Sequence, residues 1–176
     1  MKRILLISGS REGHTHKINE FIGQQLGQVE IDHLSLNQAY NSQLDLSPYH
    51  AIVIGASIHY GYFPKELYSF IAKHLQKLQE IPSYFFGVCL TARKENKRSI
   101  ENNLYMQKFL QKSPWQPKEA AVFAGALNYS ILSFWDRNII RFIMLLTKGD
   151  TDPKTNKVYT DWQDVTAFAK KIKDNF

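Results

Sequence analysis

The chain has 176 residues, 44% of them hydrophobic, which is enough to bury a proper core and fits one domain over residues 1–176 better than two. Its 22 Lys and Arg against 16 Asp and Glu give a formal charge of +6, which favours an acidic partner: an anionic membrane surface, a polycarboxylate substrate or nucleic acid. The single cysteine, Cys89, excludes an internal disulfide framework and a cysteine-rich metal site, and it fits a reducing cytoplasm.

Short apolar runs recur along the chain and alternate with amphipathic segments of helix length. The expected strands are residues 4–7, 51–55, 84–90 and 120–126, with a weaker edge strand over 29–36. The expected helices are residues 15–26, 64–78, about 101–110, and a last helix that starts at the capping box Thr160-Asp161-Trp162-Gln163. Strands that are apolar throughout predict helices on both faces of the sheet. We therefore expect an α/β fold with a doubly wound, five-stranded parallel sheet of order 2-1-3-4-5.

A loop rich in glycine and hydroxyl groups follows the first strand and leads directly into a helix. It reads Ser8-Gly9-Ser10-Arg11-Glu12-Gly13-His14-Thr15. The hydroxyls of Ser10 and Thr15 can donate to phosphate oxygens, and free N–H groups at the helix N-terminus face the anion. The loop resembles the FMN phosphate loop of flavodoxins at Ser10, Gly13 and Thr15, although Glu12 replaces a usual hydroxyl. A plain helix-capping turn is the alternative.

Two more loops are expected at the same edge of the sheet, because ligands of open α/β sheets bind beyond the carboxyl ends of the strands. One is Ala56-Ser57-Ile58-His59-Tyr60-Gly61-Tyr62 and the other is Cys89-Leu90-Thr91-Ala92-Arg93-Lys94. Their aromatic and small side chains could sandwich an isoalloxazine ring. The candidate cofactor-binding residues are Ser10, Arg11, Glu12, Gly13, His14, Thr15, Ser57, Ile58, His59, Tyr60, Gly61, Leu90, Thr91, Ala92 and Arg93.

Basic residues cluster directly after the second of these loops. Arg93, Lys94, Lys97 and Arg98 are the candidate substrate-binding residues, since they could hold carboxylates, Arg by bidentate pairing and Lys as a point charge. A solvated helix start is the alternative for each residue alone.

Residues 127–158 form a segment that is too long for an ordinary connection after the fifth strand. Leu132, Trp135, Ile139, Phe142, Ile143 and Leu146 recur there at helical spacing. Arg137 and Arg141 lie off this stripe. Such a helix could rest on a lipid surface, with basic residues meeting anionic headgroups, or pack on the domain's own core. The apolar run 139–146 is too short to span a bilayer, so membrane contact is expected to be peripheral.

Several separated motifs complete the pattern. They are Gly55-Ala56-Ser57-Ile58-His59-Tyr60-Gly61, Ala92-Arg93-Lys94 with Lys97-Arg98, Gly125-Ala126-Leu127, Trp135-Asp136-Arg137 and Val158-Tyr159-Thr160-Asp161-Trp162. In this order they resemble the oxygen-independent, flavodoxin-like protoporphyrinogen oxidases, in which an acidic residue at the Glu12 position is usual. The resemblance implies a flavodoxin-like fold, FMN as cofactor, and oxidation of protoporphyrinogen IX to protoporphyrin IX in haem biosynthesis. It also implies a membrane quinone, menaquinone or ubiquinone, as electron acceptor, and a peripheral location at the cytoplasmic face of the bacterial inner membrane.

Alternative functions share parts of this pattern. A flavodoxin-type electron carrier would share the fold and FMN, but the basic charge and the extra segment disfavour it. A soluble NAD(P)H-dependent quinone reductase is the second alternative. A nucleic-acid partner is not expected because no reading motif is present. The histidines show no metal-ligand spacing, so no metal is expected, and Cys89 reads as a buried small residue. The oligomeric state, including a homo-oligomer, is left open.

Overall fold

The fold is seen in a computed structural model that describes all residues from 1 to 176. Five parallel strands form one sheet: β1 (Arg3–Gly9), β2 (Glu30–Ser35), β3 (Ala51–Ser57), β4 (Ser83–Cys89) and β5 (Glu119–Ala124). Their order is β2-β1-β3-β4-β5, which confirms the expected topology. Every side chain of β4 and nearly every one of β1 and β3 is buried, as expected for strands covered on both faces.

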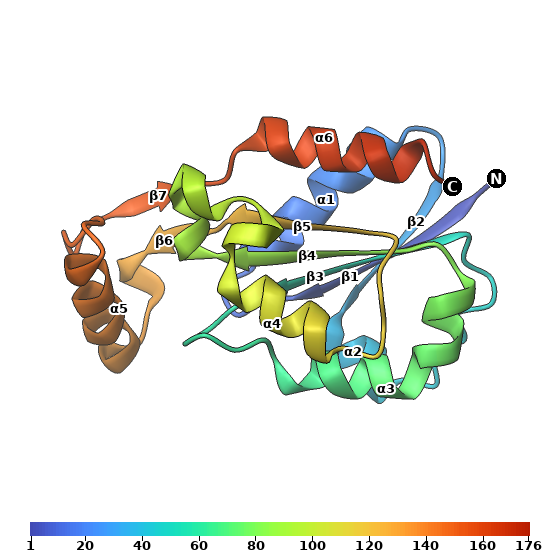
Figure 1. The fold of residues 1–176 in the computed structure, drawn as a ribbon, viewed down its shortest axis with the longest axis horizontal. Helices are drawn as coiled ribbons and strands as arrows, with labels where there is room; N and C mark the ends of the chain where they lie inside the picture. The colour runs from blue at the N-terminus through green and yellow to red at the C-terminus, as the bar shows by residue number, and fades with distance from the viewer.

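Helices cover the two faces of the sheet (Figure 1). One face carries α1 (His14–Leu26) and α6 (Trp162–Lys173), and the other carries α2 (Leu36–Asn41), α3 (Lys65–Glu80) and α4 (Leu104–Lys112). Short 3-10 turns at Leu90–Arg93, Glu95–Lys97 and Ile100–Asn102 join β4 to α4. Each face therefore has its own apolar core, and the sheet lies between them.

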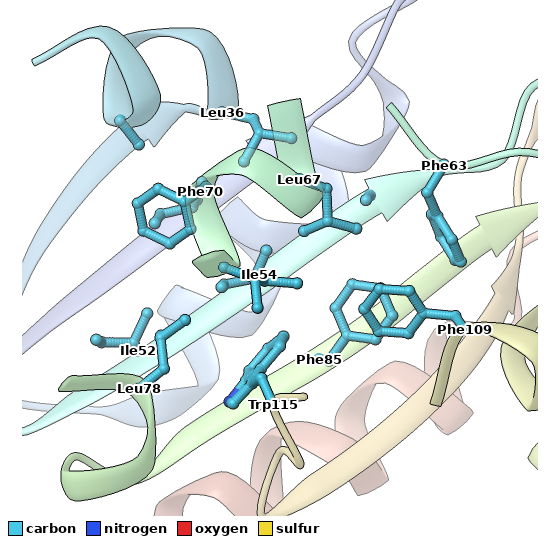
Figure 2. Packing of buried hydrophobic residues seen from close by; sticks show 14 of the residues in the cluster. Leu36, Ile52, Ile54, Phe63, Leu67, Phe70, Leu78, Phe85, Phe109 and Trp115 are labelled. Carbon is cyan, nitrogen blue, oxygen red and sulfur yellow. The ribbon is translucent and has the colours of Figure 1, made fainter. Parts of the chain in front are cut away.

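Aromatic side chains dominate the core under α3 and α4 (Figure 2). The ring of Phe85 lies 4.5 Å from that of Phe109 and 5.8 Å from that of Trp115, between ring centroids. The buried indole N–H of Trp115 donates to Ser83 Oγ at 2.8 Å, and the Ser83 hydroxyl donates to the Leu78 carbonyl. The polar atoms of this buried network are thus paired, which removes the penalty of burying them.

Two predicted boundaries are wrong. The edge strand ends at Ser35, and Leu36 begins α2, because Ser35 and Gln38 form a capping box that starts a helix there. At the last helix, Asp161 is the N-cap and accepts the Gln163 N–H, whereas the Thr160 hydroxyl is turned inward and donates to the Ala124 carbonyl. The other core strands and helices lie within a few residues of their predicted positions.

The extra segment lies beyond the carboxyl ends of the strands, at the end of the molecule opposite the chain termini (Figure 1). In the structure it begins one residue earlier than predicted and spans residues 126–158. It contains β6 (Ala126–Asn128), a 3-10 turn at Tyr129–Ile131, α5 (Phe134–Leu146) and β7 (Asn156–Val158). β6 and β7 pair antiparallel in a separate two-stranded ribbon. Leu127, Tyr129 and Met144 make a small apolar core of their own under α5. The extra segment therefore forms a second layer beyond the carboxyl ends of the strands, where it faces the loops after them.

Candidate functional site

A cavity of about 600 Å³ lies where the loops after β1, β3 and β4 meet the extra segment. The loops contribute Ser10, Glu12, His14, Thr15, Ser57, Ile58, His59, Tyr60, Gly61, Leu90, Thr91 and Arg93, all of which the sequence predicts. The extra segment contributes Leu127, Asn128, Ile131, Leu132, Ile140, Ile143, Met144, Thr147, Asn156 and Val158. With Ala126, the extra segment supplies 11 of the 28 residues that line the cavity, and none of the 11 is a predicted site residue.

The phosphate loop is held in shape by glycine and serine. Gly13 has a left-handed φ of 82° at the N-cap of α1, and its N–H donates to Ser10 Oγ at 2.9 Å. Thr15 is only 1% exposed, yet its hydroxyl oxygen has no hydrogen-bond partner in the protein. A buried hydroxyl at a helix N-terminus, lining a cavity, is a site that an anion completes. Glu12 is exposed at the rim.

His14 ties this loop to the far edge of the sheet. Its Nε2 lies 2.6 Å from Thr160 Oγ1, and because the Thr160 hydroxyl already donates to the Ala124 carbonyl, Nε2 carries the hydrogen. Burial, and then the charge of Lys17, lowers the pKa of His14 below its ordinary 6.5. The imidazole is therefore neutral near pH 7 and acts as a donor that positions the start of α1.

The loop after β3 makes a tight turn at the cavity. His59 and Tyr62 exchange backbone hydrogen bonds of 2.9 and 3.1 Å, and Tyr60 and Gly61 between them both have positive φ, 49° and 86°. A left-handed tyrosine is uncommon and needs side-chain contacts to hold it. The turn places Tyr60 in the wall of the cavity between the sheet and the extra segment.

A carboxylate on α5 holds that turn. Asp136 accepts a hydrogen bond from the Tyr60 hydroxyl and another, at 2.7 Å, from Ser133, the N-cap of α5. These two hydrogen bonds lower the pKa of Asp136, while desolvation and the bond to Asp136 raise the pKa of Tyr60 to about 12. His59 Nε2 lies 3.5 Å from the same carboxylate and 2.6 Å from Arg11 Nη1. The start of α5 is thereby fixed to the β3 loop.

Arg93 fixes the other end of α5. Its guanidinium donates to the Thr147 hydroxyl at 2.7 Å, to the Thr147 carbonyl at 3.2 Å and to the Leu90 carbonyl at 3.0 Å. Thr147 is the C-cap of α5, where a cation is favourable. Arg93 lines the cavity as predicted, and three hydrogen bonds from its guanidinium go to partners within the protein. It connects the β4 loop to the extra segment.

The other predicted substrate-binding residues do not reach the cavity. Arg98 donates to Asp161 at 3.1 Å and to the Ala92 carbonyl at 3.4 Å, which places it against the start of α6. Lys94 is exposed and Lys97 half-buried, and neither lines the cavity. Ala92, a predicted cofactor contact, is fully buried in the core. The prediction of one cationic cluster facing the substrate is therefore not supported by the geometry.

A second hollow of about 670 Å³ adjoins the first, and Ser10, Ser57 and His59 line both. Arg11, another predicted cofactor contact, lies here, together with Lys65 at the start of α3. Hydroxyl groups of Ser8 and Ser35 line it as well. Besides Arg93, the cationic side chains at the two hollows are Arg11, Lys17 on α1 and Lys65, and of these only Arg11 is a predicted site residue.

The outer face of α5 exposes large apolar side chains. They are Phe134, Trp135, Ile139, Phe142, Ile143, Leu145 and Leu146, and of the helix only Met144 is buried. This confirms the helical stripe but excludes packing of its face on the core. Arg137 and Arg141, which lie off this face, donate to the carbonyls of Tyr129 and Thr151.

No group of three or more His, Cys, Asp or Glu side chains is placed to hold a metal ion. No helix has the length and apolar character required to cross a bilayer.

Comparison with known proteins gives a consistent result. The flavodoxin domain model matches residues 5–154. The protoporphyrinogen IX dehydrogenase (quinone) of Escherichia coli K12 is 38% identical over 172 residues, covering 98% of this chain and 94% of the relative. The enzyme of that name from Leishmania major is 40% identical over 170 residues, covering 95% of this chain and 73% of the relative.

Solved structures agree on the fold. Oxidised flavodoxin 1 from Bacillus cereus superposes with a TM-score of 0.52 at 16% identity, over 99% of both chains. The rubredoxin oxygen:oxidoreductase of Desulfovibrio gigas reaches a TM-score of 0.54 at 11% identity, over 99% of this chain and 36% of that chain.

Proposed function

Because this chain belongs to the flavodoxin domain family and, within it, to the protoporphyrinogen IX dehydrogenases (quinone), we propose that it oxidises protoporphyrinogen IX to protoporphyrin IX in haem biosynthesis. FMN is the bound cofactor, and a membrane quinone, menaquinone or ubiquinone, is the electron acceptor. The observation that carries the proposal is the single cavity shared by three cofactor-type loops and an apolar wall from the extra segment. A simple electron carrier has no use for that wall.

The residues present fit FMN. The unpartnered hydroxyl of Thr15 and the N-terminus of α1 suit the phosphate, and Ser10 keeps its hydroxyl hydrogen to donate because it accepts from Gly13 through its lone pair. The β3 and β4 loops, with Tyr60 and Leu90, line the space for the ring. When bound, FMN would supply a two-electron acceptor for the porphyrinogen and a donor for the quinone, and three such transfers convert one protoporphyrinogen IX to protoporphyrin IX.

The chain's own residues set the conditions for that exchange. Leu132, Ile140 and Met144 of the extra segment cover the cavity with apolar atoms, which excludes water from a reduced, reactive centre. The anchors at Asp136 and Arg93 hold this cover at both ends of α5. The neutral His14 keeps the start of α1 in place without adding a charge of its own.

The half-reactions test the proposal. FMN-loaded protein is mixed anaerobically with protoporphyrinogen IX, and the visible absorbance of the flavin is followed until it bleaches. Menadione is then added, and we expect the absorbance to return while porphyrin fluorescence has risen. Rapid bleaching by NADPH, with none by the porphyrinogen, would instead identify a nicotinamide-dependent quinone reductase.

We further propose that the protein binds peripherally to the membrane that holds its quinone, the cytoplasmic face of the bacterial inner membrane. The apolar outer face of α5 supports this location, since an exposed patch of this kind commonly marks an interaction surface. The formal charge of +6 suits anionic lipid.

Vesicle binding tests the location. Replacing Phe142 and Leu146 together by Asp should weaken binding to anionic vesicles by about tenfold or more, because charged groups oppose burial at the interface. Neither side chain lines the cavity, so flavin binding should be unchanged. Leu104→Asp, at an exposed apolar residue on α4, is the control. If the face joins two copies of the chain instead, the wild type is a dimer by light scattering and the double variant a monomer.

A further inference from the structure

Three apolar side chains belong to the cavity and to the outer surface at once. Ile131, Ile143 and Val158 line the cavity, yet they are 58%, 42% and 52% exposed. They come from the turn after β6, from α5 and from β7. The cavity therefore opens to the outside between these elements, and its opening is continuous with the exposed apolar face of α5.

The wall stays apolar from this opening inward. Leu132, Ile140 and Met144 line the same cavity, together with Leu90 and Ile58 of the loops after β4 and β3. Leu132, Ile140 and Leu90 pack against the small core that contains Met144. Two polar side chains of the segment already have partners, since Thr147 donates to the Ile143 carbonyl and accepts from Arg93, and Asn128 Oδ1 accepts from Ser130. A third, Asn156, lines the cavity from an exposed position on β7. Any group that lies along this path meets mainly hydrocarbon.

The path is held open by fixed supports. Asp136 ties the start of α5 to the β3 loop, and Arg93 ties its end to the β4 loop. Ile140 and Ile143 lie in the middle of the helix, between the two ties. The wall is thus a preformed surface of the kind that small-molecule sites use.

We propose that this opening, rimmed by Ile131, Ile143 and Val158, holds the isoprenoid tail of the quinone while its ring reaches the flavin. The inference rests on the proposed function and assigns a separate site within it. A hydrocarbon tail matches the wall, whereas the carboxylates of a porphyrinogen would be buried there without partners. Arg11 and Lys65 line the other hollow. Of the cations in this cavity, Arg93 is bonded to Leu90 and Thr147, and Lys17 lies on α1 beside the phosphate loop. Continuity with the α5 face lets a tail pass from lipid to the cavity without crossing water.

Two quinones that differ only in the tail provide the test. FMN-loaded protein in detergent micelles, where vesicle docking has no role, is reduced by protoporphyrinogen IX and reoxidised by menadione or by menaquinone. Ile143→Asn places an amide in the opening. We expect the KM for menaquinone to rise about tenfold, as for the loss of one buried aliphatic contact, while the KM for menadione stays within about twofold.

Leu145→Asn is the matched control, because Leu145 is 66% exposed on the same helix but does not line the cavity. It should leave both KM values unchanged. Equilibrium binding of menaquinone to the flavin-free protein, followed by quenching of tryptophan fluorescence, should weaken in Ile143→Asn and not in Leu145→Asn. Thermal melting checks that both variants fold.

The outcomes separate this inference from the proposed function. If menadione and menaquinone are used equally well by the wild type, or if Ile143→Asn slows both alike, the tail does not lie in this opening, although the function stands. If neither quinone reoxidises the flavin, the proposed function fails and the inference with it.

Discussion

The central sheet and the extra segment, residues 126–158, bury their apolar side chains in opposite ways. In β4 every residue is buried, and most large apolar side chains around the sheet belong to the cores on its two faces. On α5 only Met144 is buried, and a row of aromatic and aliphatic side chains faces outward. The first arrangement stabilises the fold. The exposed row on α5 does not stabilise the fold, so we propose that it binds lipophilic partners.

The largest expected effect separates the two regions by stability. Phe85→Ala, in the core of Figure 2, should lower the free energy of unfolding by about 3–5 kcal/mol, through lost burial and the cavity left behind. Phe142→Ala, at a side chain 60% exposed on α5, should change it by no more than about 0.5 kcal/mol. Urea denaturation of the two proteins measures both values. Similar losses would mean that the outer face of α5 is covered.

A second prediction concerns the phosphate loop, where function and stability should move apart. Thr15→Val removes a buried hydroxyl without a partner and keeps the side-chain shape. The free energy of unfolding of the flavin-free protein should not fall, whereas FMN affinity should drop by about 10- to 100-fold, the value of a hydrogen bond to a charged group. Quenching of FMN fluorescence measures the affinity. Thr166→Val, at an exposed position on α6, is the control and should leave the FMN affinity unchanged.

The third prediction tests the anchor between the two regions. Tyr60→Phe removes only the hydroxyl that donates a hydrogen bond to Asp136. We expect amide hydrogen exchange to become several-fold faster in α5 and to stay the same in α1, since only the segment loses a support. Tyr68→Phe, on α3, is the matched control. Unchanged exchange in α5 would show that its start is held by other contacts.

The smallest effect is on pH dependence. Burial lowers the pKa of His14 in the folded state, so the unfolded state binds the proton more readily as pH falls. Stability linked to His14 is therefore fully present above pH 6.5 and is lost as pH falls through the lowered folded pKa. Burial also lowers the pKa values of His33 and His74, which act in the same direction.

Replacing His14 by Gln should thus reduce, but not abolish, the fall in unfolding free energy between neutral and mildly acidic pH. Urea denaturation of the flavin-free protein at the two pH values measures it. An unchanged pH dependence in the variant would show that the pKa of His14 is the same in the folded and the unfolded state.

The three loops that line the cavity could be predicted from local sequence. The phosphate loop and the β3 and β4 loops are each continuous in sequence and follow a buried strand, so their meeting at one edge follows from the topology. The predicted cluster of cations facing the substrate does not form, because Arg98 pairs with Asp161 and Arg93 with Thr147. Both partners lie far along the chain, so local sequence does not predict these pairings. On α5 the apolar pattern runs round much of the helix, and periodicity does not say which face meets the core. Packing alone decides that.

Steady-state turnover under anaerobic conditions tests the central assignment most directly. The FMN-loaded protein is supplied with protoporphyrinogen IX and menadione, and porphyrin fluorescence is followed beside reactions that lack protein, FMN or quinone. We expect porphyrin formation that is proportional to the protein concentration and that requires both FMN and the quinone. Tight FMN binding with no porphyrin above the protein-free reaction would contradict it and would leave a carrier or reductase of another substrate.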